Sequence, residues 1–351
     1  MEKTIKLSTN NLKQGYRLAR NVKHKYGSIV LPAETILDKE KIHRLQRMDL
    51  KQVTVYREQK EKREKNIEKN KNLEKNYYLS VNEVDSMFHQ IKEKEKIAVT
   101  RINDLIDKIT NLGQDNEMID LLIKLRNANK YPYHHLLNMG ILGYMFGKWL
   151  NLNKKRCIDL TYAGLLHDAG MAFIPENILY KPGNLTKKEY EKIKQHPKKG
   201  YKLVENLNFI SRETAQGILT HHERYDGSGY PLHLEGENIP LFGRILAIID
   251  TFNALTSERV YQPRISPFEA IKLFREDTLG AFDYNLVDIF LRKIPDYFVN
   301  KKVFLNDGRE AEVVFINPRH PDKPIVKIND QYIDLYQNKE IKIEGLSKKI
   351  I

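Results

Sequence analysis

Residues 165–170 read Leu165-Leu166-His167-Asp168-Ala169-Gly170, and this stretch decides how the rest of the chain is interpreted. The apolar pattern before it, from Arg156 onward, predicts a helix that ends at His167-Asp168, with Gly170 placed to stop it. Adjacent helical residues point about 100° apart, so this pair can offer a nitrogen to one metal ion while its carboxylate bridges two. One His-Asp dipeptide is common by chance, so the interpretation depends on partners elsewhere in the chain.

Further imidazoles and one carboxylate lie on four other segments with a helical pattern. In chain order they are His134, His135, His196, His221, His222 and Asp250. Asp250 is the most informative, because its helix is apolar on nearly every side and an unpaired carboxylate there costs several kcal/mol. A salt bridge between helices or a metal ion would offset that cost, and the density of histidines favours the metal. Of His134 and His135, only one need be a ligand. His196 is expected to close a helix that begins after Thr186, because Pro197 disfavours a helical conformation in the residue before it.

Imidazoles and carboxylates without thiolates suit iron, manganese or zinc rather than magnesium or calcium. Two ions that share an aspartate can activate a water and hold a phosphoryl oxygen, which is the logic of two-metal hydrolysis of phosphate esters. The residues alone therefore predict a helical metallohydrolase with phosphoesters as its substrates.

Composition sets the wider limits. At 351 residues, the chain is expected to hold two or three domains. No apolar run approaches the roughly 20 residues that cross a bilayer, the N-terminus lacks a secretory core, and Cys157 is the only cysteine, so a cytoplasmic location is predicted. The net charge of +13 comes from lysine interleaved with glutamate, which is typical of solvated helix faces. Because no aromatic residues accompany the charge in a stacking motif, nucleic acid is not an expected partner.

The pattern along the chain predicts a mainly α protein in five segments. These are a small α+β domain (1–57), a charged linker or solvated helix (58–79), a helical connector (80–130), the histidine-rich helical domain (131–300) and a small β appendage (301–351). Within the first segment, strands at 28–31 and 52–56 flank a helix at 38–47. Within the last, Asn306-Asp307-Gly308 predicts a hairpin, and 325–328 and 341–343 predict further strands.

The histidine-rich segment resembles the HD-GYP domain, a branch of the HD phosphohydrolase superfamily. The matching motifs are Tyr133-His134-His135, residues 165–170, Ile174-Pro175, 181–186, His196-Pro197, 221–224, 226–231 and 250–259. The resemblance covers about 131–294, nearly half the chain. It implies a helical HD-type bundle that hydrolyses the bacterial second messenger cyclic di-GMP.

The resemblance also implies roles for individual residues. The metal ligands would be His135, His167, Asp168, His196, His221, His222 and Asp250, with His167 and Asp168 at the catalytic centre. Some members carry a glutamate four residues before the first histidine and hold a third metal. Tyr131 stands there in this chain, so two divalent ions are expected, iron or manganese. Two-metal members tend to stop at the linear dinucleotide pGpG, which is the expected product, with GMP left open.

Five positions bear on the substrate. Met171 stands where the family usually has a lysine thought to hold substrate phosphate, and Gln262 replaces a further basic residue. Each lost cation removes a charge-assisted contact worth roughly 1.5–3 kcal/mol. Arg259 remains, Arg264 is placed to compensate, and Tyr230 is a further substrate contact.

These departures leave three alternatives open. The first is the cyclic di-GMP phosphodiesterase, the second a degenerate domain that binds the messenger or a protein without turnover, and the third hydrolysis of another nucleotide such as a cyclic GMP-AMP hybrid. The Gly229-Tyr230-Pro231 loop is either a tight turn with a packed tyrosine or, as in the family, a contact for diguanylate cyclase (GGDEF) partners. Residues 1–57 resemble a segment often found before HD-GYP domains, and a homodimer or a sensing role is expected of them.

Overall fold

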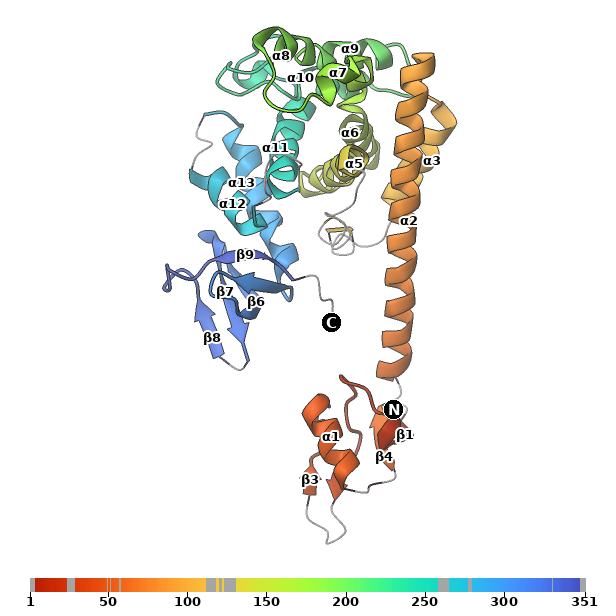
Figure 1. Cartoon of the computed structure of the whole chain (residues 1–351), viewed down its shortest axis with the longest axis vertical. Helices are drawn as coiled ribbons and strands as arrows, with labels where there is room; N and C mark the ends of the chain where they lie inside the picture. The colour runs from red at the N-terminus through yellow and green to blue at the C-terminus, as the bar shows by residue number, and fades with distance from the viewer. Residues whose placement is uncertain are drawn as a thin grey trace. The chain divides into compact units, whose positions relative to one another are not determined.

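The computed structural model describes residues 4–23, 29–48, 50, 52–56, 58–111, 118–119, 122, 131–257, 265–276, 280–329 and 331–347, with the backbone alone described at 29, 58–71 and 131. Contacts divide the chain into two units, Met1–Lys75 and Asn76–Ile351. The predicted fold class is confirmed: a mainly α chain with a helical bundle, a small N-terminal α+β piece and a small C-terminal sheet (Figure 1).

The N-terminal unit pairs its strands around a small core of its own. Strand β1 (Thr4–Ser8) runs antiparallel to β4 (Gln52–Tyr56), and β2 (Val22–Lys23) runs antiparallel to β3 (Ile29–Leu31). Between β1 and β2 lies a 3-10 turn, η1 (Thr9–Asn11). Helix α1 (Lys39–Arg47) begins where Asp38 accepts a hydrogen bond from the backbone N–H of Lys41 at 2.8 Å. The predicted helix and two strands are confirmed, whereas β1 and β2 were not predicted.

The charged stretch expected to be a linker or a solvated helix is helical. It forms the first part of α2 (Glu58–Lys94), which is continuous across the boundary between the two units. In its C-terminal part, Val84, Met87 and Ile91 are buried and Phe88 is half-buried, so the predicted apolar face is confirmed. The five segment boundaries remain predictions.

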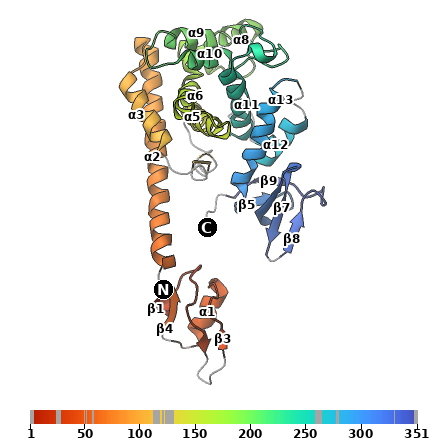
Figure 2. The ribbon, with the colours of Figure 1, turned by 180° about the vertical axis from the view of Figure 1, so that it is seen from behind.

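The helical domain is built from helices and short 3-10 turns. They are α3 (Val99–Thr110), α5 (Tyr131–Trp149), α6 (Lys154–Leu166), η2 (Ala169–Phe173), α7 (Glu176–Leu179), α8 (Lys187–Ile193), α9 (His196–Val204), α10 (Arg212–Thr220), η3 (Gly236–Asn238), α11 (Leu241–Thr256), α12 (Pro267–Glu276), α13 (Tyr284–Lys293) and η4 (Pro295–Phe298). Helices α5 and α6 lie side by side, with α11 beside α5 (Figures 1 and 2). They approach closely because Gly164 has no side chain: a Cβ there would lie 2.3 Å from the carbonyl oxygen of Met139.

Two expectations about helix ends were wrong. His196 does not close α8, which ends at Ile193, but opens α9, with Pro197 in the first turn. A proline is tolerated there because the first-turn N–H groups have no partner within the helix. Gly170 does not stop α6 through its backbone conformation. Gly170 lies in η2, where only a glycine fits, because a Cβ would lie 1.9 Å from the carbonyl oxygen of His196.

The C-terminal residues form a five-stranded antiparallel sheet with the strand order β8-β7-β6-β5-β9. The strands are β5 (Lys302–Leu305), β6 (Glu310–Asn317), β7 (His320–Ile328), β8 (Gln331–Asp334) and β9 (Ile343–Leu346). The predicted hairpin joins β5 to β6, with Gly308 at a φ of +82°. Strand β8 was not predicted, and the strand expected at 341–343 overlaps β9 only at Ile343. Arg275 of α12 forms an ion pair with the buried Asp322 of β7, which ties the sheet to the helices.

Candidate metal centre

Three of the predicted ligands share one local hydrogen bond. Nδ1 of His167, His196 and His221 lies 2.8, 2.7 and 2.7 Å from the carbonyl oxygen three residues earlier in the chain. Each of these histidines stands at a helix end, where a carbonyl is available. Because a carbonyl only accepts, each Nδ1 carries the proton and each neutral ring keeps a lone pair on Nε2. This is the tautomer in which an imidazole binds a metal through Nε2.

The Nε2 atoms of these buried rings face one another. Nε2 of His196 lies 3.2 Å from Nε2 of His221, and Nε2 of His167 lies 3.2 Å from Nε2 of His135. Two unprotonated nitrogens at this distance repel each other, so the pair of His196 and His221 needs a cation between the rings, either a proton or a metal ion.

The carboxylate of Asp168 lies between the two histidine pairs. Its Oδ1 is 3.1 Å from Nε2 of His196 and 3.8 Å from Nε2 of His221. Its Oδ2 is 3.5 Å from Nε2 of His167 and 4.0 Å from Nε2 of His135. One oxygen therefore faces each pair, which is the arrangement of a carboxylate that bridges two cations.

Asp250 and His222 complete the two groups. Oδ1 of Asp250 lies 3.4 Å from Nε2 of His135, and the ring centroid of His222 lies 4.1 Å from that of His221. In each group, one donor atom from every residue lies within 4.8 Å of the others: His135, His167 and Asp250 in the first, and Asp168, His196, His221 and His222 in the second. These are the seven ligands predicted from the sequence. A buried set of imidazoles and carboxylates fits a divalent transition metal, and we call it the candidate metal centre.

Charge at this centre also favours a cation. Burial alone would raise the pKa of Asp168, but the positive charge of His167 and the hydrogen bonds that His196 and His221 donate when their Nε2 atoms are protonated hold that pKa well below its usual range. Burial lowers the pKa of His221 to about 4 and holds that of His222 well below its ordinary value. Burial acts to lower the pKa of His196 as well, but its hydrogen bond to Asp168 outweighs this and raises it. Without a metal, the centre thus holds an ionised carboxylate beside two rings, His221 and His222, that burial keeps neutral.

The loop after α10 packs its tyrosine against this centre. The ring centroid of Tyr230 lies 4.8 Å from that of the ligand His222, and burial raises the pKa of Tyr230. The buried carboxylate of Glu223 fixes the loop by accepting the backbone N–H groups of Leu232 at 2.7 Å and Leu234 at 3.1 Å. Tyr230 is therefore packed inward, whereas contact of this loop with a diguanylate cyclase partner stays a prediction.

The other predicted substrate contacts are not placed. Arg259, Arg264 and Gln262 lie outside the described residues. Met171 lies half-buried in η2, three residues after Asp168.

Three residues near the centre were missed by the sequence analysis. Asn253 contacts His135 from one turn beyond Asp250, and Tyr77 of α2 contacts His134 and Asn138. Nζ of Lys194 lies 5.7 Å from the ring centroid of Tyr230. The helical spacing from Asp250 could have indicated Asn253, whereas nothing in the sequence pairs Tyr77 with a residue nearly sixty positions away.

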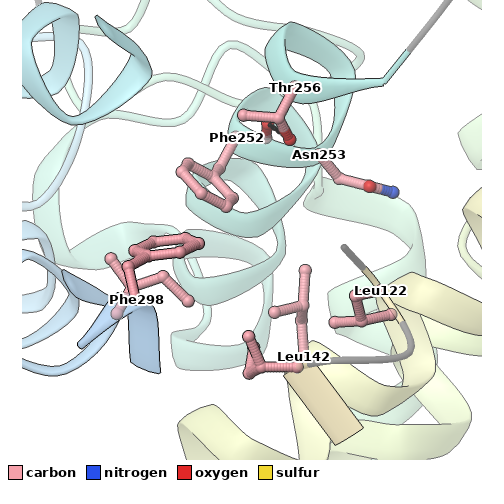
Figure 3. Close-up of a pocket in the computed structure, with 8 residues that line it drawn as sticks. Leu122, Leu142, Phe252, Asn253, Thr256 and Phe298 are labelled. Carbon is pink, nitrogen blue, oxygen red and sulfur yellow. Dashed lines mark hydrogen bonds between the residues drawn. The ribbon is translucent and has the colours of Figure 1, made fainter. Parts of the chain in front are cut away.

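A pocket between α5, α11 and η4 is not the chemical site (Figure 3). Its lining is apolar apart from two side chains: Ile119, Leu122, Leu142, Phe252, Asn253, Thr256, Ile294 and Phe298. None of the seven metal-centre residues lines it. Asn253 stands at both places, since it lines this pocket and contacts His135.

Comparison with known proteins places this centre in a family. A family model described as "HD domain" matches residues 120–286, so the chain carries an HD domain. Several curated relatives named as cyclic di-GMP phosphodiesterases match at 30–39% identity, and the domain is of the HD-GYP type. The HD family is metal-dependent, and the two residue groups above are its candidate metal ligands in this chain.

Two relatives and one structure indicate the range of the similarity. "Cyclic di-GMP phosphodiesterase PA4108" of Pseudomonas aeruginosa is 32% identical over 247 residues, which are 70% of this chain and 59% of that protein. "3'3'-cGAMP-specific phosphodiesterase 1" of Vibrio cholerae is 34% identical over 171 residues, which are 48% of this chain and 39% of that protein. The structure of Bd1817, an HDG"Y"P protein from Bdellovibrio bacteriovorus, covers 82% of this chain and 98% of its own, at 16% identity and a TM-score of 0.45.

The chain spans about half the length of the curated relatives that it matches. Across the part of the chain that the structure describes, no helix combines the length and apolar character of a membrane-spanning segment.

Proposed function

We propose that this chain is a metal-dependent phosphodiesterase that hydrolyses cyclic di-GMP to pGpG. The position of Asp168, with one carboxylate oxygen toward each histidine pair, carries this proposal, because it suits two cations acting on one phosphate. The names of the relatives at 30–39% identity supply the substrate.

Each residue of the centre has a proposed part in the reaction. When bound, two divalent ions would activate a water and neutralise charge on the scissile phosphate. His135, His167 and Asp250 would hold one ion, and His196, His221 and His222 the other. Asp168 would face both ions and, being ionised at neutral pH, fix their separation. The buried rings behind it exclude bulk water, which strengthens these interactions.

Iron or manganese are the proposed ions. Imidazole and carboxylate donors suit these metals, and the described residues around the centre add no thiolate, since Cys157 is buried in α6 away from the two groups. Two ions rather than three remain the proposal because Tyr131 replaces the family's further glutamate.

Substrate phosphate needs cations, and Lys194 is a described candidate. Its ammonium lies against Tyr230, which in turn packs on His222. It also donates to Glu191 at 2.8 Å, an exposed carboxylate that a phosphate could replace. With Arg259 and Arg264, it would offset the cations lost at Met171 and Gln262.

Two other functions keep specific support. Met171 in η2 favours a receptor that binds cyclic di-GMP with little or no turnover, because the usual lysine is missing beside Asp168. The relative named as a 3'3'-cGAMP-specific phosphodiesterase favours a cyclic GMP-AMP substrate.

Protein partners are also proposed. Leu232 is 45% exposed in the loop that Glu223 fixes, so this loop presents an apolar side chain to a diguanylate cyclase partner while Tyr230 packs inward. A homodimer and a cytoplasmic location complete the proposal.

The test combines metal analysis with product chromatography. Purified protein is loaded with iron or manganese under reducing conditions and incubated separately with cyclic di-GMP and 3'3'-cGAMP. We expect two equivalents of metal and conversion of cyclic di-GMP to pGpG, with Asp168→Ala as the inactive control that loses metal.

Each alternative has its own outcome. Tight binding of cyclic di-GMP without cleavage, with cleavage appearing in Met171→Lys, would establish the receptor instead. Faster cleavage of 3'3'-cGAMP would reassign the substrate, and metal-loaded protein that neither binds nor cleaves either nucleotide would end the proposal.

A further inference from the structure

His135 differs from the three histidines that bond to carbonyls. Its Nδ1 lies 2.8 Å from Nδ2 of the Asn253 side chain, and both residues are buried. Asn253 follows Asp250 by three residues on α11, so one helix face presents both a candidate ligand and the partner of another.

The orientation of this amide sets which nitrogen of His135 carries a proton. With Nδ2 toward the ring, Asn253 donates and Nδ1 accepts, so the proton of a neutral ring is on Nε2. That Nε2 lies 3.2 Å from Nε2 of His167, whose Nδ1 donates to a carbonyl and whose Nε2 therefore accepts. A proton thus lies between the two rings, where an ion would bind.

Ion binding requires the opposite arrangement. Nε2 of His135 must lose its proton, and a neutral ring then carries it on Nδ1, which needs an acceptor. Turning the amide by 180° supplies one, because Oδ1 of Asn253 takes the place of Nδ2. Ser257 permits both orientations: its hydroxyl now donates to Oδ1 at 3.2 Å, and a hydroxyl can equally accept from Nδ2.

We propose that Asn253 is a positioning residue that sets the tautomer of His135, and that its amide reverses when an ion binds to His135, His167 and Asp250. The inference rests on the metal centre of the proposed function. It assigns the two ions different affinities, because His135 must change its tautomer before it binds, whereas Nδ1 of His196 and His221 already donates to a carbonyl in the metal-free protein. The ion at His135, His167 and Asp250 is therefore the more weakly held.

The tautomer is measured directly by ¹⁵N nuclear magnetic resonance of histidine-labelled full-length protein, with zinc as a diamagnetic probe. In metal-free protein, His135 is expected with its proton on Nε2, and in zinc-loaded protein with its proton on Nδ1. The same proton position in both states would overturn the reversal of the amide.

Variants test the positioning role through metal affinity. Asn253→Leu keeps the size of the side chain but cannot accept a hydrogen bond, and is expected to weaken one of the two zinc ions by about 10–100-fold while leaving the other unchanged. Asn253→Asp accepts from Nδ1 and should hold both ions at least as tightly as the wild type. Thr256→Val is the matched control, since Thr256 lies on the same helix, is buried, lines the same pocket and bonds only to its own helix at Phe252.

The outcomes separate this inference from the proposed function. The inference would be overturned if Asn253→Leu bound two ions with the affinity of the wild type. It would also be overturned if Asn253→Leu and Asn253→Asp both bound both ions equally weakly and melted at a lower temperature, because that result marks a purely structural role of Asn253. Wild-type protein that binds two ions but leaves cyclic di-GMP intact would sink the proposed function alone.

Discussion

Burial keeps two imidazoles of the candidate metal centre, those of His221 and His222, neutral by lowering their pKa. His221 is fully buried, and burial lowers its pKa to about 4. His222 shifts in the same direction, while the contact with Asp168 raises the pKa of His196. The same burial that prepares the rings for a metal therefore makes the metal-free protein sensitive to acid.

The metal-free protein should lose stability between pH 6.5 and 4. In this range the unfolded chain protonates His221 and the folded protein does not, so the unfolded state binds more protons and the free energy of unfolding falls with pH. A shift from 6.5 to about 4 corresponds to about 3 kcal/mol. His196 does not cancel this loss. Its pKa is raised in the folded protein, so its contribution to stability is fully present below pH 6.5 and declines only as the pH rises through the pKa that His196 has in the folded protein. Urea unfolding at several pH values measures the effect.

The control for this prediction is His221→Asn, which should flatten the dependence in the same range. A free energy of unfolding that stays constant or rises as the pH falls from 6.5 to 4 would contradict it.

Sequence reasoning identified which residues form the centre but not what orients them. Asp250 could be found because a carboxylate in an apolar helix requires a cation. The Nδ1 partners of His167, His196 and His221 are backbone carbonyls, which every residue type possesses, so no sequence signal marks them. Asn253 is an ordinary helical asparagine until the fold brings it to His135.

At the scale of elements, close backbone contact fixes the distance between η2, which directly follows the candidate ligand Asp168, and α9, which begins at the candidate ligand His196. Gly170→Ala is expected to displace His196, because the new Cβ would lie 1.9 Å from its carbonyl oxygen. We expect a loss of about 1–3 kcal/mol in the free energy of unfolding and less than two equivalents of bound metal. Thermal unfolding and metal analysis check both. Gly345→Ala is the control, since nothing lies within 4 Å of its Cβ position, and equal behaviour of the two variants would refute the argument.

A second element, α2, is bonded to the helix that carries His135. The hydroxyl of the buried Tyr77 lies 2.7 Å from Oδ1 of Asn138 and 3.1 Å from Nδ1 of His134 on α5. Tyr77→Phe leaves both buried groups without this partner and should cost about 1–3 kcal/mol. Chemical denaturation measures the loss. Tyr78→Phe is the matched control, because Tyr78 is 45% exposed, and the prediction is wrong if it destabilises the protein as much.

Helices and strands with an amphipathic pattern could be predicted from the sequence. Those that form only by pairing with residues far along the chain could not. The buried faces of α2 and α3 follow from helical periodicity, and the β5–β6 hairpin from its turn residues. Strand β1 depends on pairing with β4 more than forty residues later, and β8 is a short edge strand with little apolar content. The start of α9 at His196 was missed because Pro197 is compatible with the end of one helix and the first turn of the next.

At the scale of the whole molecule, the N-terminal core and the candidate metal centre lie in different units. Tyr16, Leu18, Leu37, Leu45 and Val55 are buried in a core that belongs to the N-terminal unit alone. The seven metal-centre residues and the contacts that orient them all lie in the second unit. Among the described residues, the contacts given for the metal centre therefore come from the second unit.

Deletion of residues 1–57 should accordingly leave a folded protein with an intact metal centre. The deletion keeps α2 whole, including Tyr77 and its bonds to α5, and removes the elements that form the described core of the first unit. We expect two equivalents of metal, the same affinity for zinc and the same rate of cyclic di-GMP cleavage as in the full chain at saturating substrate. Deletion of residues 1–79, which also removes Tyr77, is the contrasting variant and should be less stable by at least the loss predicted for Tyr77→Phe. A protein that loses metal or unfolds when residues 1–57 are removed would show that the first unit supports the centre.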